Sequence, residues 1–304
     1  MKRFKSVIAL IAAGIMTTVC FTGCGGGGNE SASQGEAQTA DGGALTLNEI
    51  KAKGALVVAT EAAYEPFEYL DGDDIIGYNA DLFQKIADDL GVELDYRDLP
   101  FQGILAGLDA KKYDMVGATL GVTAERAEKY TMTYPIERGT NVFMKRKGDD
   151  TINSIEDMSG KVVGTQTACY NETDTQAYNE KLIAEGKEGY KELKTYDSFP
   201  EAYMELKNGQ LDLVAQNYAS ASAVVMKNPD DYEIVKDENG NAAMVGDEET
   251  WLAWAVRKED TELSDYINSE IHKFKEDGTL AQLQEKWFGE SVEELPESDY
   301  ARKN

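Results

Sequence analysis

The sequence predicts an α/β fold of two lobes, each built on a mainly parallel sheet that is flanked by helices. Two observations favour this fold. Short apolar runs of strand length alternate with segments of helical periodicity along residues 56–256, which is typical of parallel sheets covered by helices. One helix–strand unit also occurs twice in the chain, which indicates that a second lobe repeats the plan of the first.

The alternation begins with an apolar strand at 56–59. Residues 80–90 then show helical spacing of apolar side chains, and Gly91 closes this predicted helix. A strand at 92–96 and a helix at 101–108 come next. Further strands are expected at 115–116, 161–164, 193–196, 211–215 and 252–256.

The repeated unit is a helix that leads through a turn into a short strand. It covers residues 101–116 in its first copy and 199–214 in its second, with Phe, Leu, Asp and Val at the same offsets. The residues after each strand, 118–119 and 216–217, are therefore expected in equivalent places. Ligands bind at the carboxyl ends of the strands in open parallel sheets. We therefore expect one cleft between the lobes.

Two crossover segments should join the lobes, near 139–143 and near 249–253. The predicted organisation is lobe 1 at 45–140 and 251–290, lobe 2 at 141–250, and an acidic, solvated tail at 291–304.

The N-terminal residues carry the pattern of an export signal. Lys2, Arg3 and Lys5 precede a charge-free run at 7–21, which is too short for a spanning helix. The following residues, with Cys24 behind small side chains, resemble the lipobox of bacterial lipoproteins. This resemblance implies a signal at 1–23, a lipid on Cys24 and an extracytoplasmic, membrane-anchored protein.

Two features bear on that interpretation. Phe21 stands where the lipobox usually has Leu, and the alternative is a plain secretory signal with an incidental cysteine. Residues 29–44 contain Gly, Ser, Ala, Gln, Glu and Thr but no aromatic side chain, so 24–44 is predicted to be a flexible, lipidated tether.

Composition excludes several classes of partner. The formal net charge is −26, and loss of the three basic residues of the signal makes it more negative still. Nucleic acids and anionic lipid surfaces need a basic footprint, so neither is expected as a partner. We interpret the negative charge as a property of a solvated surface rather than as an indication that the ligand is cationic. Cys169 is the one cysteine left after Cys24, so no intramolecular disulfide is expected.

From residue 56 to 289 the chain resembles the extracellular solute-binding proteins, family 3, of polar amino-acid ABC transporters. The motifs that carry the resemblance are 59–68, 77–82, 123–126, 134–135, 209–212, 256–258, 277–279 and 286–288. The resemblance implies the type 2 periplasmic-binding-protein fold. It also implies a monomeric receptor that closes on an amino acid or a related small carboxylate and delivers it to ABC permease subunits.

Arg126 is the strongest candidate for a ligand contact. A guanidinium just past a strand end can hold a carboxylate with two parallel hydrogen bonds, which an ammonium cannot do. The resemblance assigns this arginine to the ligand α-carboxylate; the alternative is a surface salt bridge. Thr119 and Gly121 map to the neighbouring anion-holding loop, and Gly121 lacks the hydroxyl that Ser or Thr usually supplies there.

The resemblance also points to Tyr64 and Phe101, whose rings sandwich the ligand in relatives. The alternative for both is an ordinary core aromatic. Glu61 stands at the end of the first strand in place of the more usual Asp. Its carboxylate can accept hydrogen bonds from a cationic group of the ligand.

The chain departs from the family pattern at three places. Asn217 replaces the lobe 2 aspartate that binds the α-ammonium group, so an acceptor oxygen remains but the charge is lost. Residues 168–170, which include Cys169 and Tyr170, replace Gly-Thr-Thr. Asn79 replaces an acid at a helix entry. Cys169 is interpreted as a small pocket-lining residue, with a reactive thiol as the alternative.

Catalysis finds little support, and neither a cofactor nor a metal is expected. No nucleophile–base pair, zinc spacing or phosphate loop is visible in the sequence. The alternative function is an exported dehydratase of the cyclohexadienyl or arogenate type, which resembles these binders closely. A receptor's ligand-sensing domain is disfavoured, because no spanning helix is seen after residue 288.

Overall fold

The computed structural model describes residues 43–246, 250–291, 294–298 and 300. The predicted signal, Cys24 and most of the predicted tether lie outside the described residues. No helix within the described ranges is long and apolar enough to cross a membrane.

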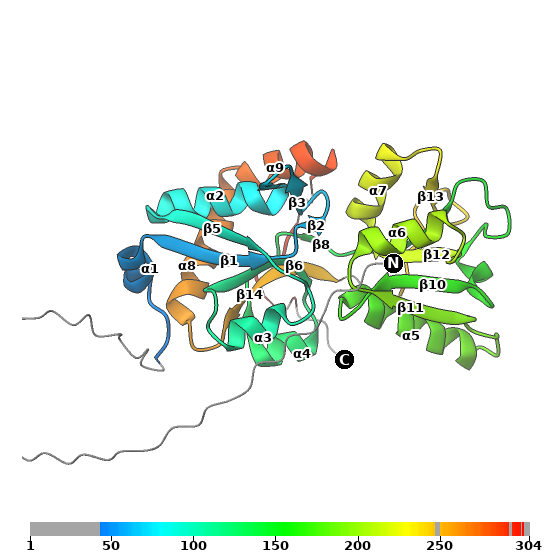
Figure 1. Cartoon of the computed structure of the whole chain (residues 1–304), viewed down its shortest axis with the longest axis horizontal. Coiled ribbons are helices and arrows are strands. Elements are labelled where there is room, and N and C mark those ends of the chain that lie inside the picture. The colour runs from blue at the N-terminus through cyan, green and yellow to red at the C-terminus, as the bar shows by residue number, and fades with distance from the viewer. Residues whose placement is uncertain (1–42, 247–249, 292–293, 299, 301–304) are drawn as a thin grey trace, which may run out of the picture. The chain divides into compact units, whose positions relative to one another are not determined.

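The first sheet carries lobe 1 (Figure 1). Its order is β5-β1-β6-β14-β7, and β8 also pairs with β14. β1 runs parallel to β5 and β6, whereas β14 is antiparallel to β6, β7 and β8. The strands are β1 (Ala55–Thr60), β5 (Glu93–Asp98), β6 (Met115–Gly121), β7 (Tyr130–Met132), β8 (Glu137–Arg138) and β14 (Trp251–Arg257).

The second sheet carries lobe 2. Its order is β11-β10-β12-β9-β13, with β10 parallel to β11 and β12, and β9 antiparallel to β12 and β13. The strands are β9 (Asn141–Arg146), β10 (Val162–Gln166), β11 (Glu192–Tyr196), β12 (Leu213–Asn217) and β13 (Tyr232–Ile234). A small antiparallel sheet in lobe 1 adds β2 (Ala63–Tyr64), β3 (Glu68–Asp71) and β4 (Asp74–Ile76).

The two large sheets repeat one plan. β1 and β10 are the central parallel strands, β6 and β12 are their equivalent neighbours, and β14 and β9 are the antiparallel strands beyond. The repeated unit of the sequence leads into β6 in one lobe and β12 in the other. The prediction of two similar lobes from that repeat is confirmed, and it places the ends of β6 and β12 in equivalent positions.

Helices cover both faces of each sheet (Figure 1). In lobe 1, one apolar layer packs α1 (Leu47–Lys53), α2 (Tyr78–Leu90), α8 (Thr261–Glu276) and α9 (Thr279–Phe288) against the sheet. α3 (Ile104–Asp109) and α4 (Ala124–Lys129) pack through the layer on its other face.

Lobe 2 is covered in the same way. α5 (Tyr170–Ala184) lies on one face of its sheet, with the short 3-10 helix η1 (Ile155–Met158) packed into the same apolar layer. α6 (Phe199–Lys207) and α7 (Tyr218–Lys227) cover the other face.

α2 shows how the sequence pattern produces such a layer. Leu82, Phe83, Ile86 and Leu90 recur at helical spacing, and all four are buried against the sheet. Gly91 ends the helix in the left-handed conformation, with its N–H bonded to the carbonyls of the last turn. The helix begins two residues earlier than the predicted 80–90.

The chain passes between the sheets twice, after β8 and before β14, so the predicted fold class with two crossover segments is confirmed. The residue limits given for the lobes stay a prediction.

The C-terminal tail differs from the solvated segment expected. Leu295 is buried in the layer beneath α8 and α9, and the Tyr300 hydroxyl donates to the Met132 carbonyl at 3.0 Å.

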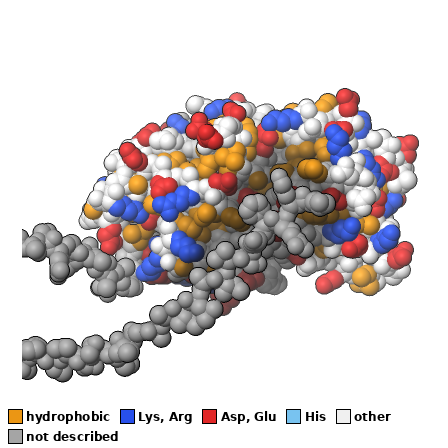
Figure 2. Space-filling model, viewed as in Figure 1, with side chains coloured by type: hydrophobic (Ala, Val, Ile, Leu, Met, Phe, Trp, Pro, Cys, Tyr) orange, Lys and Arg blue, Asp and Glu red, His pale blue; other side chains and the backbone are white. Residues whose placement is uncertain are grey.

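Acidic and basic side chains are interspersed over the face of the molecule seen in Figure 2. The large negative charge is therefore not gathered into one acidic patch on this face. This distribution is that of a solvated surface, as expected from the composition.

Candidate functional site

Side chains from both lobes, some charged or polar and others aromatic, surround a small cavity at the carboxyl ends of β1, β6 and β10. Its volume is about 10 Å³. The lining residues are Glu61, Tyr64, Glu68, Phe101, Ala118, Thr119, Gly121, Arg126, Gln166, Cys169, Tyr170, Asn171 and Phe199. An amino acid needs more room than this, so the lobes must separate to admit one.

Arg126 connects the two lobes with its guanidinium. The N-cap Thr123 positions α4 by accepting a hydrogen bond from the Arg126 N–H at 3.2 Å. The side chain then donates to the Gly121 carbonyl in lobe 1 and to the Ala168 carbonyl in lobe 2, both at 2.9 Å. Burial of this cation lowers its pKa. Within the described ranges it forms no ion pair, so it can still take a carboxylate.

Glu61 and Gln166 form a second link between the lobes. Glu61 follows strand β1, and Gln166 is the last residue of the equivalent strand β10. Gln166 Nε2 donates to both carboxylate oxygens of Glu61, at 2.9 and 2.7 Å. Burial raises the pKa of Glu61 to about 7, while the hydrogen bond from Gln166 opposes that rise. The Glu61 carboxyl can therefore exchange a proton near neutral pH.

A second acid, Glu68, lies deeper in the lobe 1 wall. It accepts hydrogen bonds from the Thr119 N–H at 2.9 Å, the Thr119 hydroxyl at 3.0 Å and Asn79 Nδ2 at 2.7 Å. Burial nevertheless raises the pKa of Glu68 well above its usual value. Thr119 thus lines the cavity, but its N–H and hydroxyl already serve Glu68.

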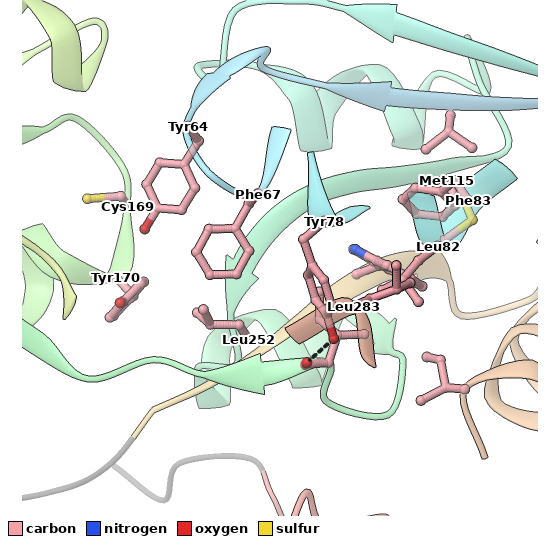
Figure 3. Packing of buried hydrophobic residues seen from close by; sticks show 14 of the residues in the cluster. Tyr64, Phe67, Tyr78, Leu82, Phe83, Met115, Cys169, Tyr170, Leu252 and Leu283 are labelled. Carbon is pink, nitrogen blue, oxygen red and sulfur yellow. Dashed lines mark hydrogen bonds between the residues drawn. The ribbon is translucent and has the colours of Figure 1, made fainter. Parts of the chain in front are cut away.

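Aromatic rings form much of the remaining wall. Figure 3 shows Tyr64 of lobe 1 beside Cys169 and Tyr170 of lobe 2. The Tyr64 hydroxyl donates to Gln216 Oε1 at 3.1 Å, and its ring centroid is 5.5 Å from that of Phe199. Phe101 lies at the rim and is only partly buried.

Gly121 and Tyr170 fit together across the cavity. A Cβ atom added at Gly121 would lie 2.6 Å from the Cβ and Cγ atoms of Tyr170, closer than real side chains approach. The missing side chain at Gly121 and the large ring at Tyr170 are therefore complementary. Two departures from the family pattern become one coupled feature.

Cys169 is a buried thiol at the N-cap of α5. Its Sγ donates to the Gln166 carbonyl at 3.0 Å. Burial raises the pKa of Cys169 to about 11, although the neighbouring Arg126 and Thr165 favour the thiolate. A thiol in this state is a packing residue of the wall rather than a nucleophile.

Asn217 is fully buried but does not line the cavity. Its Oδ1 caps α7 by accepting the N–H groups of Ala219 at 2.8 Å and Ser220 at 3.4 Å. Its Nδ2 donates to the Tyr170 hydroxyl and the Arg138 carbonyl, both at 3.3 Å. The acceptor oxygen expected here for a ligand is therefore occupied by the helix cap.

The structure brings together most of the residues singled out in the sequence. The candidates in the cavity wall are Glu61, Tyr64, Phe101, Thr119, Gly121, Arg126, Cys169 and Tyr170; only Asn217 stands behind it. Their roles toward a ligand stay a prediction.

Sequence reasoning assigned no place in the site to four residues of the wall, namely Glu68, Gln166, Asn171 and Phe199, whereas Ala118 was expected at a strand end that faces the cleft. The internal repeat could have found two of them. Phe199 occupies the place of Phe101 in the second copy, and Gln166 ends the strand equivalent to the one before Glu61. Nothing in the sequence marked Asn171. The described residues contain no group of three or more His, Cys, Asp or Glu that could hold a metal ion.

The fold and the cavity define a two-lobed α/β protein with a small site between its lobes that both charged and aromatic side chains line. The family model described as bacterial extracellular solute-binding proteins, family 3, matches residues 56–290. The chain therefore belongs to that family, as the resemblance in its sequence indicated.

Similar proteins agree with this membership. An L-cystine-binding protein of Escherichia coli K12, TcyJ, is 30% identical over 253 residues, which cover 81% of this chain and 87% of the relative. The L-cystine-binding protein TcyA of Bacillus subtilis is 29% identical over 93% of this chain and 98% of its own length. An ancestral arginine-binding protein bound to arginine is 34% identical, with a TM-score of 0.68 over 78% of this chain and 99% of that structure.

Proposed function

We propose that this chain is the extracytoplasmic, lipid-anchored receptor of an ABC importer and binds an amino acid, or a related small carboxylate, between its lobes. The observation that carries the proposal is Arg126. Its guanidinium faces an enclosed cavity, bridges both lobes and has no carboxylate partner among the described residues.

The separation of the charged groups in the cavity wall supports an amino acid in a defined orientation. Arg126 lies on one side, where a ligand carboxylate can replace the carbonyls of Gly121 and Ala168 as the acceptor. Glu61 supplies a carboxyl group elsewhere in the wall, and its ionised form attracts an ammonium or guanidinium group. Two relatives are named as L-cystine-binding and arginine-binding proteins, and each of these amino acids carries both a carboxylate and a cationic group.

Closure follows from the same contacts. A ligand held by Arg126 and Glu61 of lobe 1 and by the α5 end of lobe 2 stabilises the conformation in which the lobes touch. Each lobe alone offers only part of these contacts, so binding and closure are coupled. A permease can then distinguish the loaded receptor by the relative position of its lobes.

The first experiment is a thermal-shift screen of the purified chain with L-arginine, L-cystine, the other amino acids and small carboxylates, followed by calorimetry. A ligand at 100 times its dissociation constant stabilises the folded state by about 2.7 kcal/mol, which is readily detected. We expect stabilisation by one or a few amino acids. Failure of every amino acid and carboxylate would contradict the proposal.

The alternative of an exported dehydratase is tested in the same samples. One structural neighbour is an ancestral amino-acid-binding protein that is a precursor of cyclohexadienyl dehydratase, at 28% identity and a TM-score of 0.67. We expect no turnover of prephenate or arogenate. Formation of phenylpyruvate or phenylalanine would favour the enzyme instead.

Membrane anchoring is tested separately. Cys24→Ala should move the chain from the membrane fraction to the soluble fraction of cells that export it, because the acylated thiol is lost. Retention of the Cys24→Ala chain in the membrane fraction would contradict the anchor without affecting the ligand proposal.

A further inference from the structure

We propose that Asn171 is the lobe 2 residue that accepts a hydrogen bond from the ligand, and that it selects ligands that carry an α-ammonium group. This inference rests on the proposed amino-acid-binding function. It assigns the ammonium contact in lobe 2 to a residue at the start of α5 rather than to Asn217 at the end of β12.

Asn171 has an acceptor that nothing in the described protein uses. The side chain is fully buried, and the residue lines the cavity between the lobes. Its Nδ2 donates to Asn141 Oδ1 at 2.9 Å, which fixes the amide, while its Oδ1 has no hydrogen-bond partner within the described ranges. A buried carbonyl without a donor costs free energy, so a donor from the ligand is favoured at this place.

Asn217 cannot fill the same role. Its Oδ1 is committed to the cap of α7, and its Nδ2 is a donor that faces the Tyr170 hydroxyl and the Arg138 carbonyl. A ligand ammonium near Nδ2 would meet a second donor instead of an acceptor. Asn217 therefore offers a ligand no free acceptor atom.

The position of Asn171 suits one end of an α-amino acid. It stands three residues after Ala168, whose carbonyl accepts from Arg126, so Asn171 and the guanidinium converge on the same short loop. The carboxylate and the ammonium of an α-amino acid are attached to one carbon. A ligand whose carboxylate is held by Arg126 therefore presents its ammonium close to this loop.

The charges around Asn171 explain why a neutral acceptor is sufficient. Asn171 is the second residue of α5, where the helix dipole favours anions over cations. The compensating negative charge comes from Glu61 across the cavity, whose carboxyl is partly ionised near neutral pH. Asn171 thus supplies direction for the hydrogen bond, and Glu61 of lobe 1 supplies the charge.

The test compares two pairs of probes with the full chain. L-arginine is paired with 5-guanidinopentanoate, and L-cystine with 3,3′-dithiodipropionate; the second member of each pair lacks the α-ammonium groups. Calorimetry is done with the parent, Asn171→Leu and Asn171→Asp. Asn239→Asp, in an exposed turn of lobe 2, is the matched control for the added charge.

We expect Asn171→Leu to weaken binding of the amino acid by about 10- to 100-fold, the usual loss for a hydrogen bond to a charged group. The analogue without ammonium should change by no more than about threefold. Asn171→Asp should bind the amino acid at least as tightly as the parent, because Asp adds negative charge and the otherwise unpartnered Asn141 Nδ2 can donate to it. Asn239→Asp should have no effect.

Two results would overturn the inference. One is an amino-acid affinity of Asn171→Leu within a factor of two of the parent. The other is weaker amino-acid binding by Asn171→Asp, which would mean that the ligand presents an acceptor there. Thermal unfolding shows whether Asn171→Leu is folded, and Asn171→Asp decides the question if it is not. If the parent binds neither L-arginine nor L-cystine, the same comparison is made with the amino acid selected by the thermal-shift screen and its analogue without the α-ammonium group. Binding of carboxylates but of no amino acid would overturn the inference alone, whereas binding of neither class would contradict the proposed function.

Discussion

Arg126 shows how a single side chain connects the chemistry of the cavity to the arrangement of the lobes. Its guanidinium reaches the Gly121 carbonyl in one lobe and the Ala168 carbonyl in the other. The planar group can make these contacts and bind a carboxylate because it has five N–H donors in a fixed geometry.

Arg126→Lys should therefore lose most of the ligand affinity while keeping the charge. We expect a loss of about 2–5 kcal/mol in binding free energy for whichever amino acid the parent binds, measured by calorimetry. Arg97→Lys, on the surface beside Asp95, is the control and should bind like the parent. Binding of Arg126→Lys within a factor of two of the parent would show that the guanidinium does not hold the ligand.

Cys169 should be unreactive in the folded protein. With a pKa of about 11, about one thiol in a thousand is ionised at pH 8, and only the thiolate reacts rapidly with iodoacetamide. In a Cys20→Ser, Cys24→Ser chain, alkylation should be at least tenfold slower than that of the same chain in denaturant. Equal rates in the two states would show that the thiol is accessible and activated.

The sequence predicted the site unevenly at this scale. Arg126 was singled out because a guanidinium just past a strand end can hold a carboxylate, and the family resemblance assigned it, Tyr64 and Glu61 to the site. Asn171 was not found, because an asparagine near a helix start usually serves the backbone, and only burial and the pairing with Asn141 reveal a free acceptor. Asn217 was assigned to the ligand, but the cap of α7 already uses its oxygen.

At the scale of elements, strand β6 of lobe 1 meets the start of helix α5 of lobe 2 through Gly121 and Tyr170. The lobes can approach closely here only because Gly121 has no Cβ atom. The contact sets how far the two elements close over the cavity.

Gly121→Ser should hinder closure and weaken ligand binding by at least tenfold, since the new side chain overlaps the Tyr170 ring. Tyr170→Thr combined with Gly121→Ser should recover part of the lost affinity because the ring is gone. Calorimetry on both single variants and the double variant gives the coupling between the two positions. Additive effects would show that the two residues do not compete for the same space.

Glu137, which lies just before the first crossover, makes the free energy of unfolding of the protein dependent on pH. It begins strand β8 beside α9, is 6% exposed, and accepts from Gln284 Nε2 at 2.8 Å. Burial raises the pKa of Glu137 to about 7, from a model-peptide value of 4.5. Between these values the folded protein holds a proton that the unfolded chain releases, so this stabilisation is complete below pH 4.5 and is lost as pH rises through 7.

Glu137→Gln should therefore stabilise the protein more at pH 8 than at pH 5, by up to about 3 kcal/mol in the free energy of unfolding. Urea unfolding at the two pH values measures the difference. Glu188→Gln, an exposed position on lobe 2, controls for removal of a negative charge. An equal effect of Glu137→Gln at both pH values would mean that this carboxyl titrates alike in the folded and unfolded chains.

Elements with strong periodicity were predicted well, and those that depend on partners were not. The strands β1, β10, β12 and β14 were predicted from their apolar runs, because buried strands of such sheets are continuously apolar. The sequence did not indicate that β14 runs antiparallel to β6, since strand direction follows from where the chain crosses between lobes. The small β2-β3-β4 sheet is polar and short, and tertiary contacts with α2 rather than sequence pattern hold it.

At the scale of the whole folded body, the repeat in the sequence determines where the cavity forms. Equivalent strands in the two lobes end at the same cavity, and the pair Glu61–Gln166 joins two of those ends directly. The same layout explains why the cavity is small in the closed arrangement, because side chains of both lobes meet within it. A ligand must replace contacts between the lobes with contacts of its own.

The central claim is that one ligand is held by both lobes at once. Hydrogen exchange of the chain, with and without the amino acid selected by the thermal-shift screen, tests it most directly. We expect slower exchange in peptides covering 118–126 of lobe 1 and 166–171 of lobe 2 together, while the turn at 237–241 stays unchanged. Protection confined to one lobe, or to neither, would contradict binding between the lobes.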